Sequence, residues 1–194
     1  MRTWRVAVIV GTLVLGRVSV AGSADVTARR HVRFDNERIA EVFQRVVQRS
    51  AAFRKLLIEI NASDTFVYIE DGRCSTRTIR SCLMLAASQN GFRYLRIKIQ
   101  SREMLPVVAA QLAHELQHAA EVAQRSDVVD TATLSALYRE IGFATSMKGA
   151  PECWETQRAL ATERLVLRDL DAVRVAGSTY DAAFDAFAAP RSKH

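Results

Sequence analysis

Residues 113–121 read AHELQHAAE, and this stretch is the starting point for predicting the fold and the site. It lies within residues 106–126, which the sequence predicts to be one helix, since Pro106 suits an early helix position where its missing N–H costs nothing. On a helix, residues four apart lie one turn apart on the same face. His114 and His118 can therefore point at one metal ion.

Residues 114–118, HELQH, match the pattern H-E-x-x-H. Neutral imidazole nitrogen is a good zinc ligand. Glu115 is rotated about 100° from His114 around the helix axis, so it does not bind the metal but can reach a water held there. It can act as a general base and then pass the proton to a leaving amine. The alternative is an amphipathic helix that carries two histidines and binds no metal.

A catalytic zinc site has three protein ligands and one open position. The other two histidines, His31 and His194, lie near the ends of the mature chain, so we expect a carboxylate as the third ligand. Glu155 is the first choice. We expect it on a separate helix, residues 152–175, which can bring it to the metal from the side.

Glu121 is the second choice for the third ligand. It lies on the same helix face as both histidines. It sits further along the axis, however, where it more naturally orients His118 than shares the metal. The weaker options are Glu152 and Glu163.

The surrounding segments predict a single α+β domain over residues 25–194, with a small three-stranded antiparallel sheet. Asn36 can cap a first helix whose apolar residues recur at three- and four-residue spacing. Asn90-Gly91 is a strong hairpin signal between two strands. The expected strands are residues 65–70, 81–87 and 92–100; the expected helices are 37–50, 52–58, 106–126, 131–141, 152–175 and 178–187, with a loop at 142–151.

The strand expected at residues 92–100 comes directly before the helix with the histidines. If it forms the sheet edge beside the cleft, its free backbone groups could hold an extended peptide as an added strand. The alternative is that this strand belongs only to the core.

Residues 1–24 have the three regions of a secretory signal peptide: a positive start, an apolar run too short to span a bilayer comfortably, and small residues before a cleavage site. An uncleaved membrane anchor is the alternative. Cleavage removes three arginines, so the formal charge falls from +6 to about +3, and the remaining basic residues are scattered. The sequence therefore predicts a secreted or periplasmic protein without stable membrane insertion, and it gives little support to nucleic-acid binding.

Three cysteines remain in the mature chain. In an oxidising compartment, Cys74 and Cys82 can close a short loop as a disulfide. Cys153 would then be left over. The alternative is three unpaired thiols.

At these residues the chain resembles the zincin metallopeptidases. HELQH followed by a downstream Glu is similar to the gluzincin pattern, in which a Glu on a later helix is the third zinc ligand. The chain also resembles a set of small exported bacterial proteins that look like metallopeptidases. By this resemblance His114, His118 and Glu155 bind zinc and Glu115 is the base. The resembling segments, residues 63–70, 93–97, 113–121 and 154–156, span most of the mature chain.

The resemblance implies a zincin-like domain and an exported zinc-dependent metallopeptidase that uses Zn²⁺ and acts on a peptide or protein. Gluzincins often orient a histidine with an acidic residue soon after the third ligand. Ala159 stands four residues after Glu155, so Glu121 can take that role. Tyr138 and Tyr180 are candidates for stabilising the oxyanion. The alternative function is a non-catalytic zinc-binding or interaction protein on the same fold.

Overall fold

The structure is a computed structural model that describes residues 31–74, 81–145 and 153–188. Within these residues the chain has an α+β fold, with a mixed four-stranded sheet, a separate two-stranded hairpin and five helices. The sheet has the order β1-β2-β4-β3. Its strands are β1 (Val32–Phe34), β2 (Thr65–Asp71), β3 (Ser81–Gln89) and β4 (Phe92–Ile99), and the hairpin consists of β5 (Phe143–Ala144) and β6 (Trp154–Glu155).

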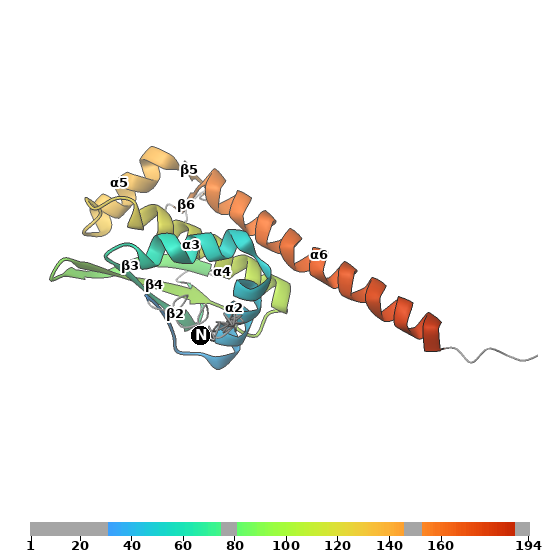
Figure 1. Cartoon of the computed structure of the whole chain (residues 1–194). Coiled ribbons are helices and arrows are strands. Elements are labelled where there is room, and N and C mark those ends of the chain that lie inside the picture. The colour runs from blue at the N-terminus through green and yellow to red at the C-terminus, as the bar shows by residue number, and fades with distance from the viewer. Residues whose placement is uncertain (1–30, 75–80, 146–152, 189–194) are drawn as a thin grey trace, which may run out of the picture.

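The helices α3 and α4 lie over one face of the sheet, and α2 packs beside them against β1 (Figure 1). The capping of α2 by Asn36 is confirmed, because its Oδ1 accepts a hydrogen bond from the backbone N–H of Ile39 at 3.1 Å. The helices are α2 (Glu37–Arg49), α3 (Ala51–Asn61), α4 (Leu105–Ala123), α5 (Thr131–Ile141) and α6 (Gln157–Ala188).

Alternate residues of β2 and β4 point into the core between sheet and helices. These residues are apolar and fully buried, and the opposite face of the sheet carries Tyr68 and Phe92, each 43% exposed. The alternation of apolar and polar residues along β2 and β4 therefore predicts correctly which side of the sheet faces the helices. The inward residues are Val67, Ile69, Leu95, Ile97 and Ile99.

The prediction of a three-stranded antiparallel sheet is wrong. The antiparallel hairpin of β3 and β4 is present, and Asn90 and Gly91 have the positive φ angles, 53° and 77°, that such a tight turn requires. However, β2 pairs in parallel with both β1 and β4. After β2 the chain passes to the far edge as β3 and returns as β4 between the two. The edges of the sheet are therefore β1 and β3, and β4 lies inside it, so the expectation that residues 92–100 could form an edge is wrong.

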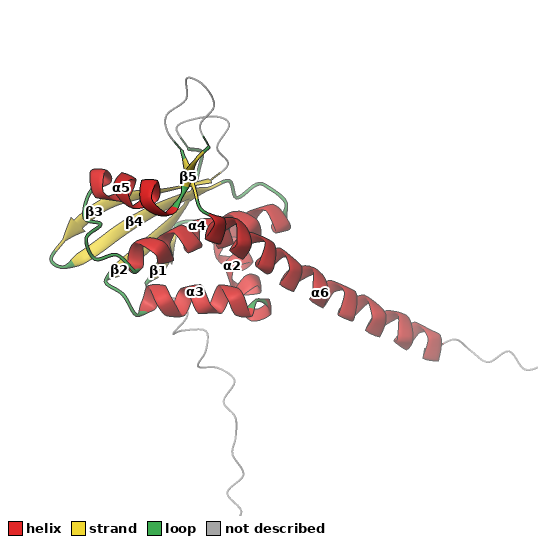
Figure 2. Cartoon of the chain, turned by 90° about the horizontal axis from the view of Figure 1, so that it is seen from above, coloured by secondary structure: helices red, strands yellow, loops and turns green. Residues whose placement is uncertain are grey.

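The C-terminal part differs from the prediction of two helices at residues 152–175 and 178–187. Residues 154–155 form β6, and a single helix, α6, follows and extends away from the domain (Figure 2). The side chain of Thr156 sets the start of α6, because its Oγ1 accepts a hydrogen bond from the backbone N–H of Ala159 at 3.0 Å. Glu155 thus stands just before a helix rather than on one.

A buried arginine holds the C-terminal end of α4. Arg93 on β4 is 3% exposed, and its guanidinium donates to the carbonyl of Val122 at 2.6 Å and to the carbonyls of Ala123 and Arg125. It also forms an ion pair with Asp64. A cation is favourable at the negative end of a helix dipole, so this arginine fixes the helix of the histidines to the sheet.

The predicted disulfide between Cys74 and Cys82 is confirmed. It ties the segment after β2 to the edge strand β3, and it is typical of an oxidising, extracytoplasmic location. No helix in the part of the chain that the structure describes has both the length and the apolar character needed to cross a bilayer. The predicted signal peptide, Glu152, His194 and the side chain of Tyr180 lie outside the described residues.

Candidate metal centre

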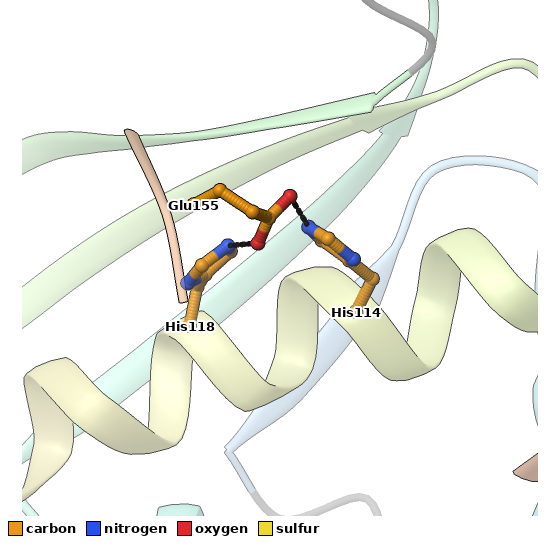
Figure 3. Close-up of side chains that lie close together, drawn as sticks. All are labelled: His114, His118 and Glu155. Atoms are coloured by element: carbon orange, nitrogen blue, oxygen red, sulfur yellow. Dashed lines mark ion pairs between the residues drawn. The ribbon is translucent and has the colours of Figure 1, made fainter. Parts of the chain in front are cut away.

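Two histidines on α4 and a glutamate on β6 point toward one another (Figure 3). His114 Nε2 lies 3.1 Å from Glu155 Oε2, and His118 Nε2 lies 3.5 Å from Glu155 Oε1. One ligand atom from each of the three residues lies within 4.8 Å of the others. The structure therefore brings the first-choice ligands together as a His-His-Glu group that could hold a metal ion.

The spacing of this group fits a small tetrahedral cation. Two donors that are each about 2.1 Å from one tetrahedral ion lie about 3.4 Å apart. The two distances from imidazole nitrogen to carboxylate oxygen, 3.1 and 3.5 Å, each end on a different oxygen of Glu155 and lie on either side of this value. Two imidazoles and one carboxylate are also a common ligand set of zinc.

The second nitrogen of each imidazole is held by another carboxylate. His114 Nδ1 lies 3.1 Å from Glu163 Oε2 on α6, and His118 Nδ1 lies 3.0 Å from Glu121 Oε2 on α4. Such partners fix the ring orientation and raise the basicity of the ligand nitrogen. Glu121 thus has the orienting role that was expected for it as an alternative to metal binding, and Glu163 has the same role for His114.

The carboxylates also shift the proton affinities of the group. Burial lowers the pKa of His118, but hydrogen bonds to Glu121 and Glu155 outweigh burial and raise this pKa to about 10. Burial also lowers the pKa of His114, but the hydrogen bond to Glu155 outweighs burial and raises this pKa. The pKa of Glu155 falls to about 2, because the two imidazoles outweigh the effect of burial. The group therefore favours positive charge between its members, and a metal cation would bind in competition with protons.

Glu115 lies beside this group but is not part of it. Glu115 is only 4% exposed, and it lines a cavity. Burial raises the pKa of Glu115, and the charges of His118 and His114 offset part of that rise. A carboxyl group whose pKa is raised by burial holds a proton more strongly than a free glutamate, as a general acid–base residue requires.

The position of Glu155 depends on Gly142, which lies between α5 and β5. A Cβ added to Gly142 would lie 2.6 Å from the carbonyl oxygen of Glu155 and 2.8 Å from that of Tyr138. Contacts this short force the backbone to move. Gly142 therefore lets the end of α5 approach β6 closely enough to bring Glu155 over α4.

Tyr138, a candidate oxyanion donor, lies under the metal group. Its hydroxyl donates to the backbone carbonyl of His118 at 3.1 Å, and its ring contacts the His118 ring edge-on at 5.1 Å between centroids. Burial raises the pKa of Tyr138 well above its usual value. These contacts support α4 from α5, and the oxyanion role stays a prediction.

Sequence reasoning missed three residues that position the site. They are Gly142, Arg93 and Thr156, and the hydroxyl of Thr156 donates to Glu121 Oε1 at 2.8 Å while the same oxygen caps α6. The cap is the signal that could have been found, because Thr is a preferred N-cap residue. It would have moved the start of the helix predicted at residues 152–175 to the residue after Thr156.

Two cavities adjoin the metal group. The larger, about 530 Å³, lies between β3, α5 and the β5–β6 hairpin, and the smaller, about 420 Å³, lies between the start of α4 and α6. Both are within the size range of ligand sites in proteins. They share Ser81, His114, Glu115 and Glu155.

No protein-family model, curated protein or solved structure matches the chain.

Proposed function

We propose that the chain is a zinc-dependent metallopeptidase that hydrolyses peptide bonds with Glu115 as its general base. The observation that supports this proposal is the convergence of His114, His118 and Glu155 beside a buried glutamate that has a raised pKa. A protein that only stores or senses a metal has no need for such a carboxyl group at the site.

The residues have the following roles in this proposal. When bound, zinc lowers the pKa of a water molecule to about 7 and polarises a carbonyl group. Glu115 takes the proton from the attacking water and passes it to the leaving amine. The His-His-Glu group holds the metal, and Glu121 and Glu163 keep the two imidazoles oriented.

The order of the sheet supports a place for an extended substrate. In the described part of the chain β3 pairs only with β4, so its other side offers unpaired backbone groups. Ser81 and Leu83 on this strand line the larger cavity next to His114 and Glu115. A peptide added along β3 would present its carbonyl groups to the metal group.

The proposed site resembles that of the gluzincins, with one difference. The third carboxylate comes from the two-residue strand β6 rather than from a helix. We propose an exported protein that acts on peptides or proteins outside the cytoplasm, and the Cys74–Cys82 disulfide supports this location.

Two measurements test the proposed function. Elemental analysis of the purified chain is expected to give one zinc per molecule, which His118→Ala loses. Glu115→Gln is expected to keep the zinc and to lose at least 100-fold in the hydrolysis of a mixed peptide pool, since a general base contributes about 10²–10⁴-fold.

The outcomes separate the candidate functions. Zinc without any hydrolysis would favour the non-catalytic zinc-binding protein. Iron(II) in place of zinc would contradict a peptidase, because two histidines and one carboxylate also form the site of iron oxygenases. Absence of any metal after reconstitution would leave HELQH as a helix with two histidines.

A further inference from the structure

We infer that the site cleaves internal peptide bonds and prefers an apolar residue on each side of the scissile bond. This inference rests on the proposed function and names its substrate class. It depends on the two cavities, which we call the α5 cavity (about 530 Å³) and the α6 cavity (about 420 Å³).

The metal group lies between the two cavities. Both are lined by Ser81, His114, Glu115 and Glu155, whereas Tyr138 lines only the α5 cavity, and Glu163 lines only the α6 cavity. A chain bound over the metal group can therefore continue on either side of the scissile bond. An enzyme that removes single terminal residues needs a closed end on one side of the metal group, whereas here a separate cavity adjoins the group on the α5 side and another on the α6 side.

Apolar residues form part of the wall of each cavity, beside the polar residues of the metal group. An apolar wall recognises an apolar side chain, and one methylene in such a pocket is worth about 1–3 kcal/mol of discrimination. Leu83, Leu134, Tyr138 and Trp154 line the α5 cavity. Pro106, Val107, Ala110 and Leu167 line the α6 cavity.

Recognition of a chain terminus would need an uncommitted charge close to the metal group. Apart from that group and Glu115, the charged residues lining the two cavities are Glu163, Arg73 and Lys98. The carboxylate of Glu163 already holds His114 Nδ1. Arg73 and Lys98 line only the α5 cavity; Arg73 is exposed, and Lys98 lies on the face of the sheet away from the helices. The α6 cavity therefore offers no cation for a terminal carboxylate, and the α5 cavity offers no carboxylate for a terminal amine besides the metal group and Glu115.

The first experiment compares free and blocked peptides on the zinc-loaded chain. One pool of internally quenched peptides has free ends, and a matched pool is N-acetylated and C-amidated. We expect kcat/KM values within about threefold of each other and cleavage between apolar residues, identified by mass spectrometry. A loss of tenfold or more on blocking, or removal of terminal residues alone, would overturn the inference.

The second experiment uses a matched pair of variants at small, half-buried helix residues. Ser135 on α5 lines one cavity, and Ala110 on α4 lines the other. Ser135→Lys and Ala110→Lys should each improve cleavage next to an acidic residue about tenfold, on opposite sides of the scissile bond. A shift to the same side in both variants, or no shift in an active protein, would contradict the two-sided site.

Different outcomes would overturn the proposed peptidase and its preference for internal bonds. Cleavage that needs zinc and Glu115 but only removes terminal residues would leave the proposed peptidase in place and overturn this inference. Equal peptide turnover by the wild-type chain and Glu115→Gln would overturn both.

Discussion

The two histidines of the metal group are held by carboxylates of very different burial. The side chain of Glu121 is 1% exposed and also accepts a hydrogen bond from Thr156, whereas the side chain of Glu163 is 34% exposed. A buried hydrogen bond is worth more, because water competes for it less. His118 is therefore the more firmly oriented ligand.

We expect Glu121→Gln to lower zinc affinity about 10–100-fold. The amide keeps the size of the side chain but loses the charge that raises the basicity of the His118 ring. Competition with a chromophoric chelator measures the affinity. Glu163→Gln is the matched control, and its effect should be smaller because water screens this carboxylate. A larger effect at Glu163 would contradict the assignment of the firmer partner.

At the scale of secondary-structure elements, the contact between α5 and β6 controls the position of Glu155, the proposed third ligand. Gly142→Ala should weaken zinc binding about tenfold or more. A Cβ at this position would clash with the carbonyl oxygens of Glu155 and Tyr138, so the backbone around Glu155 would have to move. Overpacking of this kind typically costs about 1–3 kcal/mol. Calorimetric titration with zinc measures the loss.

Gly72→Ala is the control for Gly142→Ala. Its added Cβ would meet only the side chain of Lys98, at 3.8 Å, which is an ordinary contact. This variant should bind zinc like the wild-type chain. Equal affinities for all three proteins would show that Gly142 does not position Glu155.

The link between β4 and the end of α4 should contribute strongly to stability. Arg93→Met would remove the guanidinium donor from the carbonyls of Val122 and Arg125, which would keep only one backbone donor each, and would leave Asp64 without its cation. We expect a loss of about 2–4 kcal/mol in the free energy of unfolding. Denaturant unfolding measures it. Arg96→Met, which removes a half-exposed arginine that pairs with Glu70, should cost no more than about 1 kcal/mol.

The same link predicts a pH dependence. Burial tends to raise the pKa of Asp64, but the guanidinium of Arg93 outweighs burial and holds this pKa below its usual range. A carboxyl group with a lowered folded-state pKa adds stability above its unfolded pKa of about 3.9, and this stability is lost as pH falls through the folded value. The stability difference between the wild-type chain and Asp64→Asn should be constant above about pH 5 and shrink below about pH 4. A difference that grows in acid would contradict this sign.

Some elements follow from the sequence, and others depend on contacts that no local pattern records. The helices α2 and α5 match their predictions because apolar spacing and a local cap define them. Alternation in β2 and β4 shows which face is buried, but it cannot show which strand is the neighbour. β1, β5 and β6 have only two or three residues, too few for a period to be seen.

The candidate site was predictable to a similar extent. Helical spacing places His114 and His118 on one face, and the lack of a suitable third histidine leads to a carboxylate. The predicted helix for Glu155 was wrong, because the segment begins with a strand held by the close approach of Gly142.

At the scale of the whole molecule, the metal group joins α4 and β6, and Glu163 links it to α6. Zinc at 100 times its dissociation constant should stabilise the fold by about 2.7 kcal/mol, which corresponds to about 5–10 °C in Tm. Thermal unfolding with zinc and after chelation measures the shift. His118→Ala should show none, and an equal shift in that variant would place the zinc elsewhere.

The open side of β3 has a consequence in concentrated solution. Backbone groups that can accept a substrate strand can also accept the same strand of another copy, and charged residues or proline normally prevent such self-association. Residues 81–89 read SCLMLAASQ and contain neither. We therefore expect precipitation to set in at a lower concentration when no peptide occupies the edge, so that the chain without a bound peptide is the form most prone to aggregate.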